Sequence, residues 1–450
     1  AEAEAEAEAE AGGVGKGGGR GGATATVERA VAASGAGAAA AAASGAPERQ
    51  GTGGTGGGGA AFDMFSDSPV LDLPRARKDA AATLKGAAAR DRGDAKDDVE
   101  GYFAHRAGDM LAGRYQILGA YGRGVFSTVV RCADTRAVPD AAQDGGETSP
   151  IVAIKIIRNN EMMRRAGEKE AAILHKIRAA DPEDRAHLIR FDGLFDHEGH
   201  LCLAFEAMHQ NLRQALKQHG HKRGIQIGAV RTYTKHVLTA LRHLAQCKII
   251  HADLKPDNMV VNERYTTLKV CDLGSAMETD EAEITPLLQS RYYRAPEVML
   301  GLPYGTQVDV WSCAVTLYEL YTGHFLFQGS SNNAMLKAIQ EVRGKVPARL
   351  VRKGAFASEH FTPDGDFLLE DKDKVTGGMV VREVKMTPEP APGKDIRSLV
   401  LNASGGKLSE DEQRKASLLA DLLDKLLIID PARRMTPADA LKHPFVAGKD

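Results

Sequence analysis

One stretch of the chain decides the fold, and it reads His251-Ala252-Asp253-Leu254-Lys255-Pro256-Asp257-Asn258. Asp253 carries a carboxylate that can accept the proton of a hydroxyl group. Lys255 places an ammonium group two residues later, and Asn258 adds a side-chain oxygen three residues further on. At this spacing all three groups can face one phosphoryl group and its Mg²⁺. The stretch therefore predicts a site for phosphoryl transfer.

A glycine-containing turn comes earlier in the chain, in the run Gly122-Arg123-Gly124-Val125-Phe126-Ser127-Thr128-Val129. Because glycine has no Cβ, backbone N–H groups near Gly122 and Gly124 can approach phosphate oxygens closely. A simple hairpin turn explains the same run when it is taken alone. Its place at the first turn of a predicted strand-turn-strand, residues 115–133, favours a phosphate-binding loop.

Three charged residues add to the predicted site. The run Val152-Ala153-Ile154-Lys155 lies in a strand predicted over residues 151–157, and the helix predicted over 161–177 carries Glu170. A buried Lys155–Glu170 pair would orient the ammonium group toward a nucleotide, whereas an exposed pair would be an ordinary surface salt bridge. Asp272 follows a short apolar strand, and with Asn258 it offers hard oxygen ligands that suit Mg²⁺ on phosphates better than zinc.

Later motifs complete an ordered set, namely Ala295-Pro296-Glu297, Asp309-Val310-Trp311 and Asp430-Pro431-Ala432-Arg433-Arg434. Each run alone has an ordinary structural explanation, but the whole set in this order and spacing resembles the protein kinases. The resemblance implies a buried ion pair between Glu297 and Arg434. Strands first and helices later independently favour an α+β fold with a small β-rich N-lobe and a larger helical C-lobe.

The kinase resemblance implies a chemical role for each residue of the opening stretch. Asp253 would orient the substrate hydroxyl and accept its proton, and Lys255 would neutralise the transferring phosphoryl group. Asn258 and Asp272 would hold Mg²⁺.

The same resemblance implies an ATP site. Lys155, paired with Glu170, would grip the phosphates, and the Glu206 carbonyl and Met208 N–H would bind adenine at a hinge over residues 206–209. Apolar side chains of this region also have an ordinary explanation as core. The nucleotide-binding residues implied are Gly122, Gly124, Val129, Ala153, Lys155, Glu206, Met208 and Val260.

Several strings narrow the resemblance to one family. Lys255 is typical of Ser/Thr kinases rather than Tyr kinases, and the run Ser290–Glu297 is similar to the CMGC group of kinases. Within that group, residues 98–445 resemble the pre-mRNA-processing factor 4 kinase family of the spliceosome. The strings that carry this resemblance are Gly101–Phe103, Lys155–Glu161, Asn211–Arg213, His251–Asp253, Thr285-Pro286 and Tyr318–Gly323. The resemblance implies a nuclear Ser/Thr kinase that acts on spliceosomal proteins, including Ser-Pro sites.

Two other functions stay open beside this one. A pseudokinase scaffold would bind partners without catalysis, but it would have no need for the intact acidic, basic and amide residues of the site. A sister signalling family of Tyr-regulated kinases would keep catalysis, but it is disfavoured by Leu287 after Thr285-Pro286.

The chain departs from the kinase pattern in its expected phosphorylation switch. Most kinases carry an Arg where this chain has Ala252, and the family has a Tyr at Leu287. That Arg would pair with a phosphorylated residue. We therefore expect the activation segment, which ends at Glu297, to be ordered largely without phosphorylation. Thr285 would be the phosphorylated residue that modulates it, and Arg291 and Arg294 would be the cations that pair with the phosphate. Arg294 also resembles the residue that shapes the pocket after the phosphorylated residue in this group of kinases, and that resemblance implies a preference for Pro there.

Two further departures concern Leu273, where the family has Phe, and the N-terminal tail. The Ala-, Gly- and Glu-rich sequence at the start of the chain replaces the basic tail of the family, and it predicts a disordered segment.

The composition of the chain and the character of its segments set the remaining expectations. The 450 residues are 43% hydrophobic with a formal net charge of -2, so we expect a soluble protein without direct nucleic-acid binding. No apolar run reaches membrane-spanning length, so we expect no membrane binding, and we also expect a monomeric catalytic domain. The five Cys residues form no C-x-x-C pair, which favours a reducing compartment, cytosol or nucleus.

The expected segments are a tail and linker over 1–97, a lead-in over 98–114 and a kinase domain over 115–446. Its lobes are expected over 115–207 and 208–446, with an insertion over about 329–412 that is irregular between 352 and 393.

Overall fold

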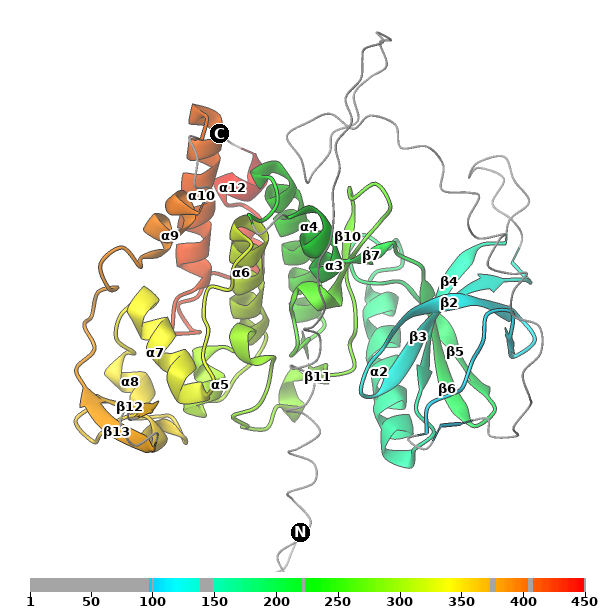
Figure 1. Cartoon of the computed structure of the whole chain (residues 1–450), viewed down its shortest axis with the longest axis horizontal. Coiled ribbons are helices and arrows are strands. Elements are labelled where there is room, and N and C mark those ends of the chain that lie inside the picture. Colours follow the sequence, from blue (N-terminus) through cyan, green and yellow to red (C-terminus); the bar gives the residue numbers. More distant parts are fainter. Residues whose placement is uncertain are drawn as a thin grey trace, which may run out of the picture. The chain divides into compact units, whose positions relative to one another are not determined.

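The computed structural model of the protein describes residues 97–98, 101–137, 149–220, 223–372, 378–403 and 408–448. The predicted disordered tail and most of the loop predicted between residues 137 and 150 lie outside this described part. Strands dominate the first half of the described residues and helices dominate the second half (Figure 1). The predicted α+β architecture is therefore confirmed.

A six-stranded antiparallel sheet forms the first part, with the strand order β1-β2-β3-β4-β6-β5. Its central strands are rich in β-branched residues that alternate between buried and half-buried positions, as expected for a pleated surface. The register pairs Val129 with Lys155 and Ala153 with Phe205, so predicted nucleotide-binding residues lie on adjacent strands. The strands are β1 (Met110–Leu111), β2 (Tyr115–Arg123), β3 (Ser127–Asp134), β4 (Ile151–Ile157), β5 (Phe191–His197) and β6 (His200–Glu206).

Helix α2 (Glu161–Ala180) packs against β4, β5 and β6 of this sheet. It begins at Asn160, whose side chain accepts hydrogen bonds from two N–H groups of the first turn. Its buried positions recur at helical spacing and include Glu170 and Ile173. The charged Glu170 therefore points to the same side as the apolar residues that bind the helix to the sheet.

Helices build the second part around α6 (Gln307–Thr322), in which every residue from Val308 to Thr322 is buried. A helix that is buried on all sides lies in the middle of a core. Helices α4 (Ile227–Gln246) and α10 (Glu410–Leu426) both pack on it. The other α-helices among the described residues are α3 (Leu212–His219), α5 (Pro296–Leu300), α7 (Asn332–Arg343), α8 (Ala348–Val351), α9 (Ile396–Asn402), α11 (Pro437–Ala440) and α12 (Pro444–Ala447).

Two short sheets lie within this helical part and carry the predicted site. One has the strand order β10-β9-β7, and the other pairs β11 with β8. The stretch quoted above follows β8 directly and leads into β9. The strands are β7 (Gln210–Asn211), β8 (Ile249–Ile250), β9 (Met259–Val261), β10 (Leu268–Val270) and β11 (Met277–Glu278).

The segment predicted to be irregular over residues 352–393 contains a β-hairpin, so that prediction was wrong. Strand β12 (Phe367–Lys372) pairs with β13 (Met379–Val384). Phe367 is buried and contacts Phe361, and the hairpin packs on α7. Gly and Pro residues around the hairpin obscure its strand signal. No helix among the described residues is both long and apolar enough to span a membrane.

Candidate active site

The loop after β8 owes its shape to a carboxylate of α6. Asp309 Oδ2 accepts a hydrogen bond from the His251 N–H at 2.7 Å, and Asp309 Oδ1 accepts one from the Ala252 N–H at 3.0 Å. Ala252 adopts a left-handed conformation with a φ of 65°, which costs a non-glycine residue about 1 kcal/mol. These two hydrogen bonds hold the backbone in that conformation and so determine where the next residue, Asp253, points.

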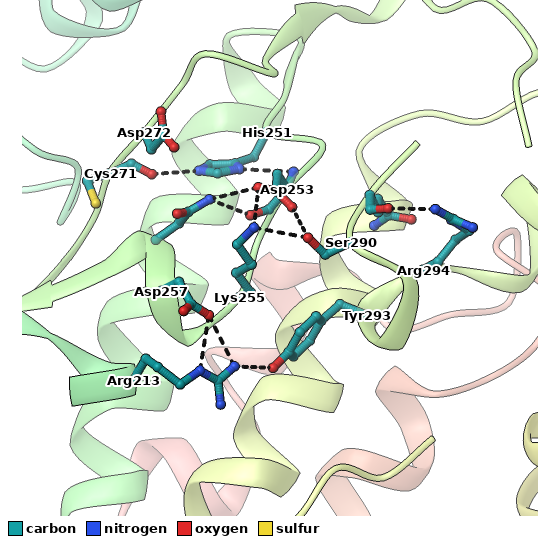
Figure 2. Close-up of polar contacts among 12 residues, drawn as sticks. Arg213, His251, Asp253, Lys255, Asp257, Cys271, Asp272, Ser290, Tyr293 and Arg294 are labelled. Carbon is teal, nitrogen blue, oxygen red and sulfur yellow. Dashed lines mark hydrogen bonds and ion pairs between the residues drawn. The ribbon is translucent and has the colours of Figure 1, made fainter. Parts of the chain in front are cut away.

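Three donors surround the Asp253 carboxylate (Figure 2). Lys255 Nζ donates to Oδ2 at 2.7 Å, and Asn258 Nδ2 donates to the same oxygen at 3.1 Å. Ser290 Oγ donates to Oδ1 at 2.7 Å and lies 3.0 Å from Lys255 Nζ. The Asp253 side chain is still 20% exposed, so a hydroxyl group can reach it. The structure thus brings together the three residues quoted first and adds Ser290, which sequence reasoning missed.

Lys155 forms ion pairs with carboxylates from two other elements. Its Nζ lies 2.8 Å from Glu170 Oε1 on α2 and 2.9 Å from Asp272 Oδ1 after β10. Burial alone would lower the pKa of Lys155, but the two carboxylates outweigh burial and raise it. Lys155 in turn lowers the pKa of Asp272 to about 2. Lys155 is therefore cationic and Asp272 anionic at neutral pH.

The two predicted Mg²⁺ ligands fit a hard cation. Asp272 is ionised and its side chain is 49% exposed, and Asn258 uses its amide nitrogen on Asp253 while its oxygen stays available to a cation. One carboxylate and one amide oxygen are too few for a closed metal site, and they suit Mg²⁺ that takes its other ligands from phosphate and water. His251 Nε2 binds the Cys271 carbonyl at 3.0 Å, which ties the two ligand-bearing segments together.

The apolar residues predicted to bind adenine lie on the central strands β3 and β4 of the large sheet, just after β6, and on β9. Val129, Ala153, Met208 and Val260 are all half-buried, and the last three pack against the main core. The Glu206 side chain accepts hydrogen bonds at 2.6 Å from Lys269 Nζ and the Arg190 N–H, which secures the hinge. Tyr121 on β2 donates to the Met208 carbonyl at 3.0 Å, a contact that sequence reasoning missed.

The segment from Asp272 to Glu297, here called the activation segment, is packed through Arg294. This guanidinium donates to the carbonyls of Leu287, Leu288 and Gln289 and to Asn332 Oδ1. Burial lowers the pKa of Arg294 to about 10, so it remains charged at neutral pH. Because its N–H groups already bind these acceptors, Arg294 shapes the segment. Arg291 is exposed and remains the predicted cation for a phosphorylated Thr285, which is half-buried.

Two groups of ion pairs, one fully buried and one partly buried, anchor the activation segment to the helical part. Arg434 Nη1 lies 2.7 Å from Glu297 Oε1 and both side chains are fully buried, so the predicted pair is confirmed. Tyr293 receives a hydrogen bond at 2.6 Å from Arg213, which also binds Asp257 and Glu319. This second group was missed, because its members lie far apart in the sequence.

Comparisons with known proteins agree with this geometry. The model of the protein kinase domain family matches residues 115–446. The chain is 41% identical to the serine/threonine-protein kinase prp4 of Schizosaccharomyces pombe over 387 residues, which cover 86% of this chain and 78% of the relative. It is 38% identical to the serine/threonine-protein kinase prpf4B of Dictyostelium discoideum over 86% of this chain and 47% of the relative. The dual specificity protein kinase CLK2 of Mus musculus is 31% identical over 78% of this chain and 68% of its own length. The chain thus spans less than half the length of the Dictyostelium relative.

Proposed function

The chain belongs to the Ser/Thr protein kinases, in the family of prp4, and on this premise we propose that it uses MgATP to phosphorylate proteins of the pre-mRNA splicing machinery in the nucleus. One observation carries the catalytic part of the proposal. Lys155 lies within 2.9 Å of both Glu170 and Asp272 while Lys255, Asn258 and Ser290 hold Asp253. Phosphoryl transfer needs these groups in place at the same time.

Asp253 is the residue that would handle the substrate proton. Lys255, Asn258 and Ser290 fix the orientation of its carboxylate, so a hydroxyl group that approaches its exposed edge meets a positioned acceptor. Lys255 already lies beside Asp253, where its ammonium group can neutralise charge on the group being transferred.

Lys155, Asp272 and Asn258 would hold the nucleotide and its metal. Lys155 is charged and kept in place by Glu170, so its ammonium group is already positioned to bind phosphate oxygens. Asp272 and Asn258 would bind Mg²⁺, which supplies charge neutralisation on the phosphates when bound. The half-buried apolar residues near the hinge offer a surface for adenine.

The substrate class and the compartment rest on family resemblance. The prp4-type strings and the similarity to prp4 and prpf4B support spliceosomal substrates and a nuclear location. Gln289 adopts a φ of 69° and its carbonyl is bound by Arg294. That backbone shape supports the proposed preference for Pro after the phosphorylated residue.

A phosphorylation assay with Asp253→Asn tests the proposal. We expect kcat on spliceosomal and Ser-Pro peptides to fall about 10²- to 10⁴-fold, because the amide cannot accept the proton. Asp411→Asn, an exposed carboxylate change on α10, is the matched control and should leave kcat unchanged. Equal inactivity of the wild-type chain and Asp253→Asn would contradict the proposal and favour a non-catalytic scaffold.

A further inference from the structure

A tyrosine outside the catalytic site contacts the tip of the Gly-rich loop, residues 122–129. Tyr102 lies in the lead-in segment and is 7% exposed. Its hydroxyl group donates to the Gly124 carbonyl at 2.8 Å and lies 3.0 Å from the Val125 carbonyl, a three-centre hydrogen bond. The kinase reaction described above makes no use of this residue.

A second residue binds the same loop from the same lobe. Arg158, just after β4, donates from Nη1 to the Val125 carbonyl at 3.1 Å, and its backbone N–H donates to the Phe126 carbonyl at 3.1 Å. Its guanidinium also lies 4.5 Å from the centre of the Tyr102 ring, and that of Arg123 lies 3.6 Å from it. Tyr102 and Arg158 together therefore bind three consecutive carbonyl groups of the loop.

The direction of these carbonyls determines where the loop N–H groups point. In a trans peptide the C=O and N–H bonds point to opposite sides. The three bound carbonyls belong to the peptides that carry the N–H groups of Val125, Phe126 and Ser127. With these carbonyls held by Tyr102 and Arg158, the three N–H groups point away from these two residues and can serve phosphate oxygens.

The chain around Tyr102 is itself anchored to the sheet, by Asp97 just before the lead-in segment and by Gly101 within it. Asp97 accepts two hydrogen bonds from the N-lobe. One comes from the ring of His200 (Nε2, 2.8 Å) and the other from the side-chain amide of Asn159 (Nδ2, 3.0 Å). The Asn159 N–H donates to the Gly101 carbonyl at 2.8 Å. Gly101 has a φ of 80°, and a Cβ there would lie 3.2 Å from the Asn159 carbonyl oxygen, which favours glycine.

We propose that Tyr102 is a positioning residue for the triphosphate of ATP, which it serves by orienting the N–H groups of the Gly-rich loop before the nucleotide binds. The inference rests on the proposed use of ATP, and it assigns a role in nucleotide binding to a segment outside the matched kinase domain. The adenine contacts do not depend on Tyr102. Its loss should therefore weaken the binding of phosphates and spare that of adenosine.

Tyr102→Phe tests this inference, because it removes the hydroxyl group and keeps the ring between the two guanidinium groups. We expect calorimetry to show a Kd for MgATP about threefold to tenfold higher and a Kd for adenosine within about twofold of wild type. In the phosphorylation assay the KM for ATP should rise while the KM for the peptide stays unchanged.

Tyr233→Phe is the matched control, since that hydroxyl group donates to the Tyr265 carbonyl within the helical part. It should change neither Kd, and thermal unfolding should show that both variants are folded. If wild type binds both ligands and Tyr102→Phe leaves both affinities unchanged, or weakens them equally, the inference is overturned. A wild-type chain that binds neither ligand would overturn the proposed function, and the inference with it.

Discussion

At the scale of single residues, the Asp253 carboxylate is held by its neighbours. Its carboxylate receives hydrogen bonds from Lys255, Asn258 and Ser290, and a side chain with that many donors has little freedom to rotate. Of these three donors, Ser290 alone belongs to the activation segment. Ser290 therefore links the orientation of Asp253 to the packing of that segment.

Replacing Ser290 tests this link. We expect Ser290→Ala to lower kcat about tenfold, because the loss of one hydrogen bond to a charged group is worth about 1.5 kcal/mol, while the KM for ATP stays unchanged. Ser290→Thr keeps a hydroxyl group and should retain most of the wild-type kcat. Steady-state kinetics with peptide and ATP varied separately will show the difference. A loss confined to the KM for ATP would contradict this role.

The contrast between Asp253 and Ser290 shows how far sequence reasoning reached. Asp253, Lys255 and Asn258 stand in one continuous motif, and their contacts were predictable from that motif. Ser290 lies 37 residues from Asp253, and a lone Ser carries no periodicity or charge pattern that would place it there. Tyr121 escaped prediction for the same physical reason, because its contact with the hinge depends on the fold of the whole sheet.

At the scale of elements, α2 is linked to the activation segment by ion pairs between basic residues of the helix and acidic residues of the segment. Lys169 on α2 lies 2.7 Å from Glu281, and Lys176 lies 2.7 Å from Glu278 on β11. Glu278 and Glu281 carry negative charge without phosphorylation, so they attract α2 in the unphosphorylated chain as well. Both pairs are about half-exposed, and each is worth less than about 1 kcal/mol.

A charge swap at one of these pairs tests whether they support activity. We expect Lys176→Glu to lower kcat/KM about twofold to fivefold at low salt through like-charge repulsion, and Lys176→Glu with Glu278→Lys to restore it. The measurement uses phosphatase-treated protein, which should itself retain most of its activity. High salt should shrink the effect, because it screens exposed charges. Loss of most activity on phosphatase treatment would contradict ordering without phosphorylation.

Elements with long, regular patterns were predictable, and short or interrupted ones were not. The strand predicted over residues 151–157 matches β4, and the helix predicted over 161–177 lies within α2. Both have uninterrupted apolar periodicity. The hairpin of β12 and β13 was missed because Gly and Pro residues surround it and the outer positions of β13 are exposed, so tertiary packing on α7 decides its structure.

At the scale of the molecule, Lys155 joins the large sheet to the helical part. It is contributed by β4, and Asp272 follows β10 in the helical part, with 2.9 Å between Nζ and Oδ1. This ion pair is one of the contacts that hold the two parts together. The protonation state of this one carboxylate therefore affects the stability of the whole fold.

The pH dependence of unfolding measures this effect. Lys155 lowers the pKa of Asp272 from its ordinary 3.8 to about 2 in the folded chain. A carboxylate whose pKa is lower when folded adds stability above its unfolded pKa, and that stability is lost as the pH falls from about 4 through about 2. The difference in unfolding free energy between wild type and Asp272→Asn should therefore be constant from pH 7 to 5 and shrink below pH about 4.

Urea unfolding at each pH gives this difference, and Asp280→Asn, an exposed change in the same segment, provides the baseline for loss of a carboxylate. A difference that already shrinks between pH 7 and 5 would mean that the pKa of Asp272 is raised, and that burial rather than Lys155 dominates at this contact.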